Sequence, residues 1–458
     1  MSAIAKKSAT RDMTQGNIYS HLIAFALPIM LSQVFQQLYN TADSLIVGRF
    51  LGTNALAAVS SSGTLIFLLV SFFNGTAMGA GVVISRYFGA NNHENVSKAI
   101  HTNILFGLVS GAFLTVVGVL FTPTFLVWMK TDPDILPEAI EYFRYYFLGA
   151  IALVMYNQLR GIMNALGDSR RPLYYLIFSS VLNIILDILF VGIFKWGVWA
   201  AAVATVISQM ASVVLCMIYL MKKGNIFTVE IKKLKFHRDM LGEIIKYGLP
   251  SGVQNSVISF ANVIVQTQIN SFGKFATAAY GTHAKIDGFA FLPMMSFNMA
   301  TSTFISQNLG AKQYDRAKKG AKFGILASVI LAELIGIAIY FSAPYLIGMF
   351  DGNATVIALG VRQARTASLF YFLLAFSHAV AAVCRGAGKA FVPMFVMLSI
   401  WCAVRIAYIA IVTYFWHDIG LIYWAYPLTW AISSAIYLIY YNCSDWIHGF
   451  DKVKPQKA

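Results

Sequence analysis

Two acidic side chains lie in long apolar segments whose composition suits the interior of a lipid bilayer. Asp187 follows Asn183 by four residues in the apolar stretch from Leu173 to Phe194, and Asp43 lies near the end of the first apolar run. A charge at the bilayer centre costs about 2.5–3.5 kcal/mol on insertion scales, so such residues usually face a polar pathway. Residues four apart share a helix face. These acids are therefore candidates for binding protons or cations.

A common depth in the membrane links these residues to a fourth one. With a rise of about 1.5 Å per residue, we expect Asp43, Asn183, Asp187 and Thr205 in the outer halves of their helices. Burial and like charge both favour the protonated form of a carboxyl pair, so this group can exchange protons. Its oxygens also suit sodium, and the residue types do not choose between the two ions. The competing interpretation is that these side chains only hydrogen-bond neighbouring helices.

Other charged residues within apolar runs lack this arrangement. Lys285, Asp287, Glu333 and Arg405 are expected to form structural ion pairs, with Arg405 pairing to Asp287 or Glu333 or contacting an anionic group. His378 is expected to be a packing residue, with a proton relay as the alternative.

Amide side chains gather on two helices of similar character. We expect them to line a central cleft: Gln33, Gln37 and Asn40 on the first apolar run, and Gln254, Asn255, Asn262 and Gln266 on the seventh. Pro28 lies inside the first run, where it removes a backbone hydrogen bond. It is a candidate hinge, with a fixed kink as the alternative.

The elements that must hold these residues are membrane-spanning helices. Hydrophobic residues make up 58% of the 458 residues and charged residues 12%, roughly half the charged share of a soluble protein. A spanning helix needs about 20 apolar residues. We predict an all-α polytopic membrane protein with twelve such runs, near residues 20–48, 54–84, 97–128, 139–162, 172–194, 197–221, 243–270, 276–306, 317–348, 355–384, 391–416 and 419–442.

The basic residues predict the orientation of these helices. If both termini are cytoplasmic, most Lys and Arg residues fall in inner segments, as the positive-inside rule requires. The net charge of +15 therefore indicates membrane topology and not a nucleic-acid partner. We expect a plasma-membrane protein.

Short motifs recur at a spacing of 221 residues. Ile84-Ser85 with Gly89-Ala90 recurs as Ile305-Ser306 with Gly310-Ala311, and Gly52 recurs as Gly273. Because six spans are even, the two halves enter the membrane from the same side. This predicts two parallel six-helix repeats: an N-terminal lobe at 1–221, a cytoplasmic linker at 222–242 and a C-terminal lobe at 243–458. Repeats of this kind are typical of transporters. At this offset Asp187 becomes Tyr408, so the acidic pair belongs to the first repeat alone.

The sequence resembles the multidrug and toxic compound extrusion (MATE) family over nearly its whole length. The resemblance rests on Leu27-Pro28 and on the stretches "YNTADSLIVGRFLG", "LNIILDILF", "FISQNLGAKQYDRAKKG" and "RGAG". It implies a two-lobed fold with a V-shaped cleft and efflux of organic cations against a proton or sodium gradient. It also implies, for the DinF-like branch, a coupling site at Asp43, Asn183, Asp187 and Thr205. Apart from Glu243 at the start of span seven, spans seven and ten contain no acid, unlike those of the other large branch.

Two other functional classes compete with an efflux antiporter as interpretations of the sequence. A lipid-linked oligosaccharide flippase would need a cationic cleft, for which Arg405 and Lys285 are the deep bases. An enzyme would need a catalytic motif such as HExxH or GxSxG, and neither occurs in the sequence. We expect no enzymatic activity, no cofactor beyond the ion gradient, small organic substrates and function as a monomer.

Overall fold

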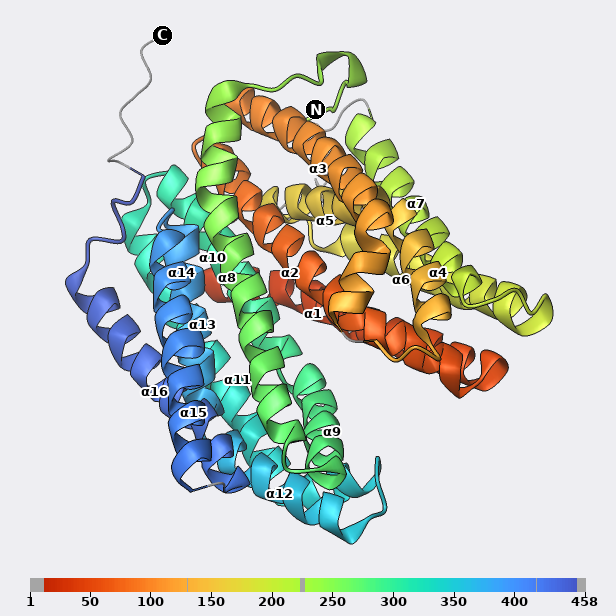
Figure 1. Ribbon diagram of the computed structural model, residues 1–458. Coiled ribbons are helices and arrows are strands. Elements are labelled where there is room, and N and C mark those ends of the chain that lie inside the picture. The colour runs from red at the N-terminus through yellow and green to blue at the C-terminus, as the bar shows by residue number, and fades with distance from the viewer. Residues whose placement is uncertain (1–11, 130, 223–226, 417, 451–458) are drawn as a thin grey trace. The chain divides into compact units, whose positions relative to one another are not determined.

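The computed structural model describes residues 12–129, 131–222, 227–416 and 418–450, which form helices and connecting turns without any strand (Figure 1). The helices of the first half are α1 (Ile18–Leu51), α2 (Thr53–Gly89), α3 (His93–Trp128), α4 (Leu136–Leu148), α5 (Ala150–Ala165), α6 (Arg170–Asp187), a π-helical turn η1 (Ile188–Ile193) and α7 (Trp199–Met221). A short 3-10 turn η2 (Ile231–Lys233) precedes the second half. That half contains α8 (Arg238–Asn270), α9 (Lys274–Ala290), α10 (Leu292–Gly310), α11 (Tyr314–Gly348), α12 (Ala354–Ser368), α13 (Tyr371–Gly386), α14 (Phe391–Met397), the π-helical turn η3 (Leu398–Val404), α15 (Arg405–Phe415) and α16 (Ile419–Cys443).

Side-chain caps explain where several of these helices begin. The Asn92 side chain accepts the backbone N–H of Asn95 at the start of α3. Asp418 accepts the N–H of Gly420 in the same way at the start of α16. Such caps satisfy backbone donors that have no partner within the helix.

The outer faces of the long helices are apolar, as lipid contact requires. On α3 the exposed side chains include Val109, Phe113 and Leu120, and on α11 they include Phe341 and Tyr345. Within the described residues, seven helices are long and apolar enough to cross a membrane, or up to eight if the bent pair α12 and α13 forms one span. The all-helical prediction is therefore confirmed.

The chain divides into two compact units whose boundaries lie inside helices α1 and α8. The described residues of 31–248 form the first unit, and residues 12–30 with 249–450 belong to the second. The expected lobes differ from these units, because the start of α1 packs with the C-terminal half. Arg316 donates hydrogen bonds to the carbonyls of Met13 and Gly16, and Tyr19 packs edge-on against Phe323. Neither contact could be predicted from hydrophobic periodicity, because each joins residues about 300 positions apart.

Backbone geometry recurs at the 221-residue spacing of the sequence motifs. The hydroxyl of Ser85 donates to the carbonyl of Ala165 (3.1 Å), and that of Ser306 donates to the carbonyl of Gly386 (2.8 Å). Left-handed residues recur in three pairs with closely similar φ angles: Gly52 and Gly273, Asn91 and Lys312, and Gly167 and Gly388. Each pair takes the same turn in its own half of the chain.

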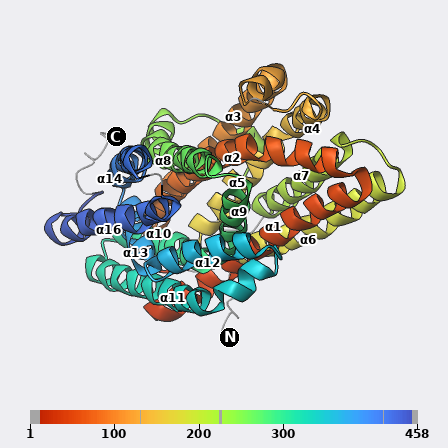
Figure 2. The same cartoon turned by 60° about the horizontal axis from the view of Figure 1, so that its bottom comes forward.

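Within the first unit, α6 and α7 run side by side (Figures 1 and 2). The second half of α1, the turn η1 after α6 and the beginning of α7 pack with α4 through a small apolar cluster that includes Val47, Tyr142, Val191 and Ala201. This cluster holds the second half of α1 against the ends of α6 and α7. It therefore brings the part of α1 that carries Asp43 beside the parts of α6 and α7 that carry Asp187 and Thr205.

Candidate functional site

The four residues expected at one depth do gather inside the first unit. Asp43 is 8% exposed, Asn183 1%, Asp187 0% and Thr205 5%. The Asn183 side-chain amide donates to the Thr205 hydroxyl at 3.4 Å, which joins α6 to α7. The carboxyl groups of Asp43 and Asp187 lie close enough to interact directly. The structure therefore forms a polar cluster from α1, α6 and α7.

Several oxygens of this cluster have no hydrogen-bond partner among the described residues. They are both carboxyl oxygens of Asp187, one carboxyl oxygen of Asp43 and the amide oxygen of Asn183. Buried polar atoms of proteins are nearly always paired, and an unpaired buried carboxylate is costly. Buried acceptor oxygens on neighbouring helices suit a proton shared between the acids or a hard monovalent cation. The arrangement is therefore suited to reversible ion binding.

Sequence reasoning did not include three tyrosines and a glutamine beside this cluster. Tyr39, Tyr142 and Tyr146 all interact electrostatically with Asp43, and Tyr39 also interacts with the Gln209 side chain. Tyr142 and Tyr146 are stacked, with ring centroids 6.2 Å apart. Helical spacing offered one signal, because Tyr39 precedes Asp43 by four residues and Gln209 follows Thr205 by four. The two tyrosines of α4 gave no signal, since nothing in their own segment indicates which helix they contact.

Pro28 lies within α1, which continues through it from Ile18 to Leu51. The unit boundary falls two residues later, between Met30 and Leu31. Pro250 has the corresponding position in α8, where the boundary falls between Gly248 and Leu249. The role of Pro28 as a hinge stays a prediction.

The amides expected to line a cleft differ in exposure. Asn40 and Asn262 are exposed, and Gln33, Gln37, Asn255 and Gln266 are half-buried. Gln266 donates to the side chain of Asn270 at 2.7 Å. Gln254 is buried and donates to the sulfur of Met397 at 2.9 Å. Gln254 therefore packs inside the second unit against the end of α14.

Arg405 does not form the expected ion pair in the described structure. Its guanidinium is buried, donates to the Thr429 hydroxyl at 2.8 and 3.2 Å, and lies over the rings of Trp401 and Tyr426. Arginine is suited to this setting because its planar group stacks on aromatic rings. The side chain is thus enclosed by α16 and η3, which does not favour an oligosaccharide flippase with an open cationic surface at Arg405.

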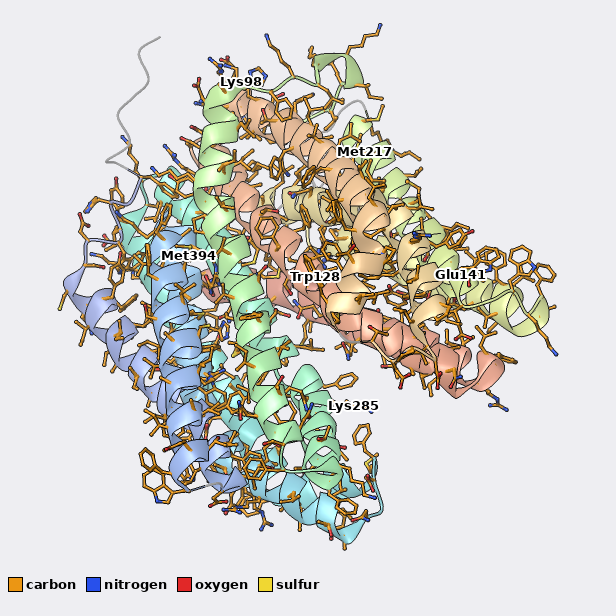
Figure 3. All side chains as sticks on the ribbon, in the orientation of Figure 1. Lys98, Trp128, Glu141, Met217, Lys285 and Met394 are labelled. Carbon is orange, nitrogen blue, oxygen red and sulfur yellow. The ribbon has the colours of Figure 1, made fainter. Side chains whose placement is uncertain are left out.

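The remaining charged residues of the second unit also have partners other than those expected. The Asp287 carboxyl accepts a hydrogen bond from the Tyr371 hydroxyl and lies 3.4 Å from Nδ1 of His283. Glu333 accepts the backbone N–H of Phe372 at 3.2 Å. Lys285 on α9 is exposed, and its ammonium lies 5.4 Å from the ring centroid of Phe350 (Figure 3). Ion pairs between these residues and Arg405 are therefore absent from the described structure.

His378 is buried and packs edge-on against Trp401, with ring centroids 5.1 Å apart. This contact agrees with a packing role.

Solved structures with the same fold cover nearly the whole chain. A crystal structure of a MATE protein in the bent conformation has a TM-score of 0.87, 21% identity and coverage of 93% of this chain and 95% of that one. The outward-facing structure of a multidrug resistance MATE family transporter has a TM-score of 0.86 at 21% identity, with coverage of 95% and 97%. At these identities the likeness concerns the fold.

Curated relatives carry names related to drug resistance. The probable multidrug resistance protein YoeA of Bacillus subtilis is 29% identical over 442 residues, covering 94% of this chain and 95% of its own. The multidrug export protein MepA of Staphylococcus aureus is 24% identical over 342 residues, covering 75% and 76%. The MatE family model matches residues 28–189 and again residues 250–411. This chain therefore belongs to the MatE family of membrane transporters.

Proposed function

We propose that this protein is a secondary active efflux antiporter of the DinF-like branch, which exports amphipathic, often cationic, compounds in exchange for protons or sodium. The observation that carries the proposal is the buried carboxyl of Asp187 beside that of Asp43, with neither acid paired to a basic residue among the described residues. Intramembrane acids of this kind are costly unless they bind an ion as part of a cycle. The names of YoeA and MepA support the class of substrate.

The proposed architecture has twelve spans in two parallel repeats of six. It treats α4 with α5, α9 with α10, α12 with α13, and α14 with η3 and α15 as one span each. Two observations support it: the turns that recur at 221 residues and the two separate matches of the family model. We place both termini in the cytoplasm and the protein in the plasma membrane as a monomer, although residues 1–11 and 451–458 lie outside the described structure.

The proposed mechanism couples ion binding to a change in α1. Protons or sodium ions from outside bind at Asp43 and Asp187 and neutralise their charge. Neutral carboxyls no longer repel one another, and the outer half of α1 then packs differently against α6 and α7. A hinge at Pro28 would confine this change to the part of α1 that follows the proline. Release of the ions inside restores the charged pair and resets the cycle.

The test is drug export from proteoliposomes in which the pH and sodium gradients are imposed separately. Asp43→Asn and Asp187→Asn should each abolish the dependence of transport on the gradient that drives the wild type. Asp315→Asn in the first turn of α11 is the control, because it removes a carboxylate outside the cluster. Wild-type transport by both cluster variants under the same gradient would rule out the assignment.

A further inference from the structure

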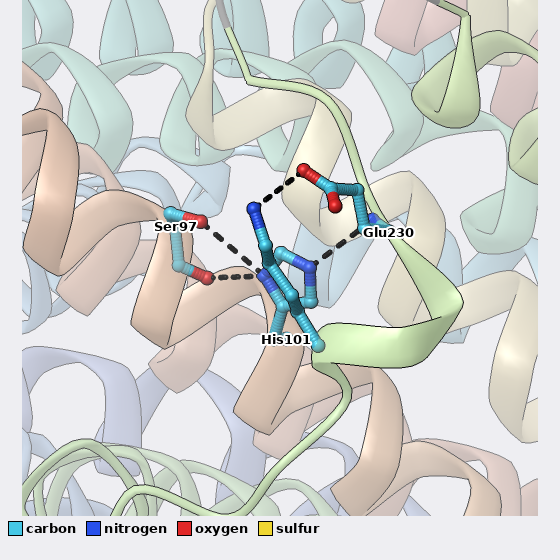
Figure 4. Close-up of polar contacts among 4 residues, drawn as sticks. Ser97, His101 and Glu230 are labelled. Carbon is cyan, nitrogen blue, oxygen red and sulfur yellow. Dashed lines mark hydrogen bonds and ion pairs between the residues drawn. The ribbon is translucent and has the colours of Figure 1, made fainter.

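Residues 227–237, which directly precede α8, form an ordered strap along the beginning of α3. The backbone N–H of Glu230 donates to Nε2 of His101 at 3.2 Å, while Nδ1 of His101 lies 2.8 Å from the carbonyl oxygen of Ser97 (Figure 4). Seven residues later the N–H of His237 donates to the Thr102 hydroxyl at 3.2 Å. Two adjacent α3 residues, His101 and Thr102, thus fix the strap near its middle and at its end.

Apolar contacts fix the beginning of the strap. Phe227 is buried, and its ring packs against those of Phe88 and His93 at the α2–α3 turn. The next inward side chain, Val229, is also buried and its N–H donates to the carbonyl of Leu220 at the end of α7. The strap therefore presents a fixed outer surface.

The strap and the ends of α7 and α8 beside it carry unpaired basic residues together with exposed apolar ones. Four basic residues form no ion pair among the described residues: Lys222, Lys232, Lys235 and Arg238. The nearby acids are already paired, Glu94 with Lys98, Glu230 with Lys233 and Glu243 with Arg86. Ile231 is 59% exposed and Phe236 37% exposed. Basic residues flanked by exposed apolar side chains are typical of segments that lie at a membrane surface.

The strap also covers the end of an apolar stripe on α3. Thr102, Val109, Phe113, Val116 and Leu120 recur at helical spacing and so share one face. The last four are strongly exposed, while Thr102 is buried by the strap. Lys98 lies on the same face one turn earlier, at the end of α3 opposite to Trp128 (Figure 3). An acyl chain lying along the stripe would bring its headgroup to Lys98 and the strap.

We propose that the strap and the start of α3 form a binding site for an anionic phospholipid. The negatively charged headgroup binds Lys232, Lys235 and Arg238, and the acyl chains lie along the apolar stripe of α3. The site is separate from the cluster at Asp43 and Asp187. It also requires no particular orientation of the protein in the membrane, so it can be tested independently of the proposed transport activity.

The test uses the full-length protein in nanodiscs of phosphatidylglycerol and phosphatidylcholine in equal amounts, with the retained lipids counted by native mass spectrometry. Wild-type protein should retain more phosphatidylglycerol than phosphatidylcholine. A basic residue near an anionic surface contributes roughly fivefold to binding, so Lys232→Gln, Lys235→Gln and Arg238→Gln together should weaken retention about a hundredfold. The matched control is Lys318→Gln, Lys319→Gln and Lys322→Gln, which removes the same charge from exposed positions of α11.

A second variant tests the fixed geometry of the strap with its charges intact. His101→Phe removes the acceptor of the Glu230 N–H, so phosphatidylglycerol retention should fall although every basic residue remains. Thermal unfolding midpoints of all variants report whether the protein is folded. Equal retention of the two lipids by wild type would overturn the proposal. An equal loss in the α11 control would also overturn it, because the effect would then reflect net charge alone.

Discussion

The Asn183 amide and the Thr205 hydroxyl form the hydrogen bond that joins α6 to α7 beside the acidic pair, with a nitrogen-to-oxygen distance of 3.4 Å. Both residues are buried, so bulk water cannot take the place of either hydrogen-bond partner. The bond orients the amide nitrogen of Asn183 toward Thr205, so the amide oxygen on the other side of the group is directed away from Thr205. That oxygen belongs to the same set of unpaired acceptors as the carboxyl oxygens of Asp187.

Thr205→Val should therefore weaken both the fold and ion coupling. The substitution preserves volume but leaves the buried Asn183 amide without its acceptor, at a cost of about 1–3 kcal/mol. Thr205→Ser retains the hydroxyl and should remain close to wild type. Thermal unfolding and gradient-driven export measure the two effects. If valine and serine variants behave alike in both assays, the hydrogen bond has no role.

Asp187→Asn should stabilise the protein in alkaline solution while abolishing coupling. The neutral amide avoids the cost of a buried carboxylate without a cationic partner, which exceeds the roughly 1–3 kcal/mol that an unsatisfied neutral group costs. The gain in unfolding temperature should be large at pH 8 and shrink at pH 5, where the wild-type carboxyl can take up a proton. Asp239→Asn, at an exposed position of α8, is the control and should show no such trend. A variant less stable than wild type at pH 8 would contradict this interpretation of Asp187.

Thr429→Val should destabilise the second unit by leaving the Arg405 guanidinium without its acceptor. A lost hydrogen bond to a charged group costs about 1.5–3 kcal/mol. Arg405→Lys should also destabilise, because an ammonium does not stack on Trp401 and Tyr426 as a guanidinium does. Thr429→Ser is the matched control for the first variant. Thermal unfolding provides the measurement, and unchanged midpoints in both variants would show that these contacts contribute nothing.

Gly79→Ala should disrupt the packing of α2 against the first part of α8. A Cβ atom at Gly79 would lie 2.2 Å from the backbone of Gly248, so one of the two helices must move. Overpacking of this kind costs typically about 1–3 kcal/mol. Gly81→Ala, two residues along the same helix, is the control because its Cβ would meet nothing closer than 3.8 Å. Unfolding midpoints that fall equally in the two variants would contradict the close approach at Gly79.

Acidification should release the strap from α3. Burial, with Lys98 and Lys235, lowers the pKa of His237 below its ordinary value of 6.5, so docking favours the neutral ring. This stabilisation is present above pH 6.5 and is lost as the pH falls through the lowered value in the docked state. His101 must also remain unprotonated at Nε2 to accept the Glu230 N–H.

Hydrogen exchange of the strap amides at pH 7.5 and 5.5, corrected for intrinsic rates, measures this release. Exchange should rise at the lower pH in wild type. In His101→Phe it should already be high at pH 7.5 and change less. Strap amides equally protected at both pH values in wild type would contradict this role of the two histidines.

The helical architecture and the four residues of the candidate site followed from the sequence alone. Long apolar runs must form helices in lipid, because every backbone group needs an internal partner there. The four-residue spacing of Asn183 and Asp187 puts them on one face, and the rise per residue sets the depth of Asp43 and Thr205. Hydrophobic run length, residue spacing and rise per residue depend only on neighbouring residues, so they can be predicted from the sequence.

Contacts between distant segments were decided only by the tertiary structure. The tyrosines beside Asp43, the enclosure of Arg405 by Thr429 and Tyr426, and the hydrogen bond between His101 and Glu230 all join separate elements of the chain. The packing of residues 12–30 with the C-terminal half has the same origin. Hydrophobic periodicity reports which face of a helix is buried, but many helices could cover that face. The choice depends on side-chain shape and hydrogen-bond partners across the whole fold.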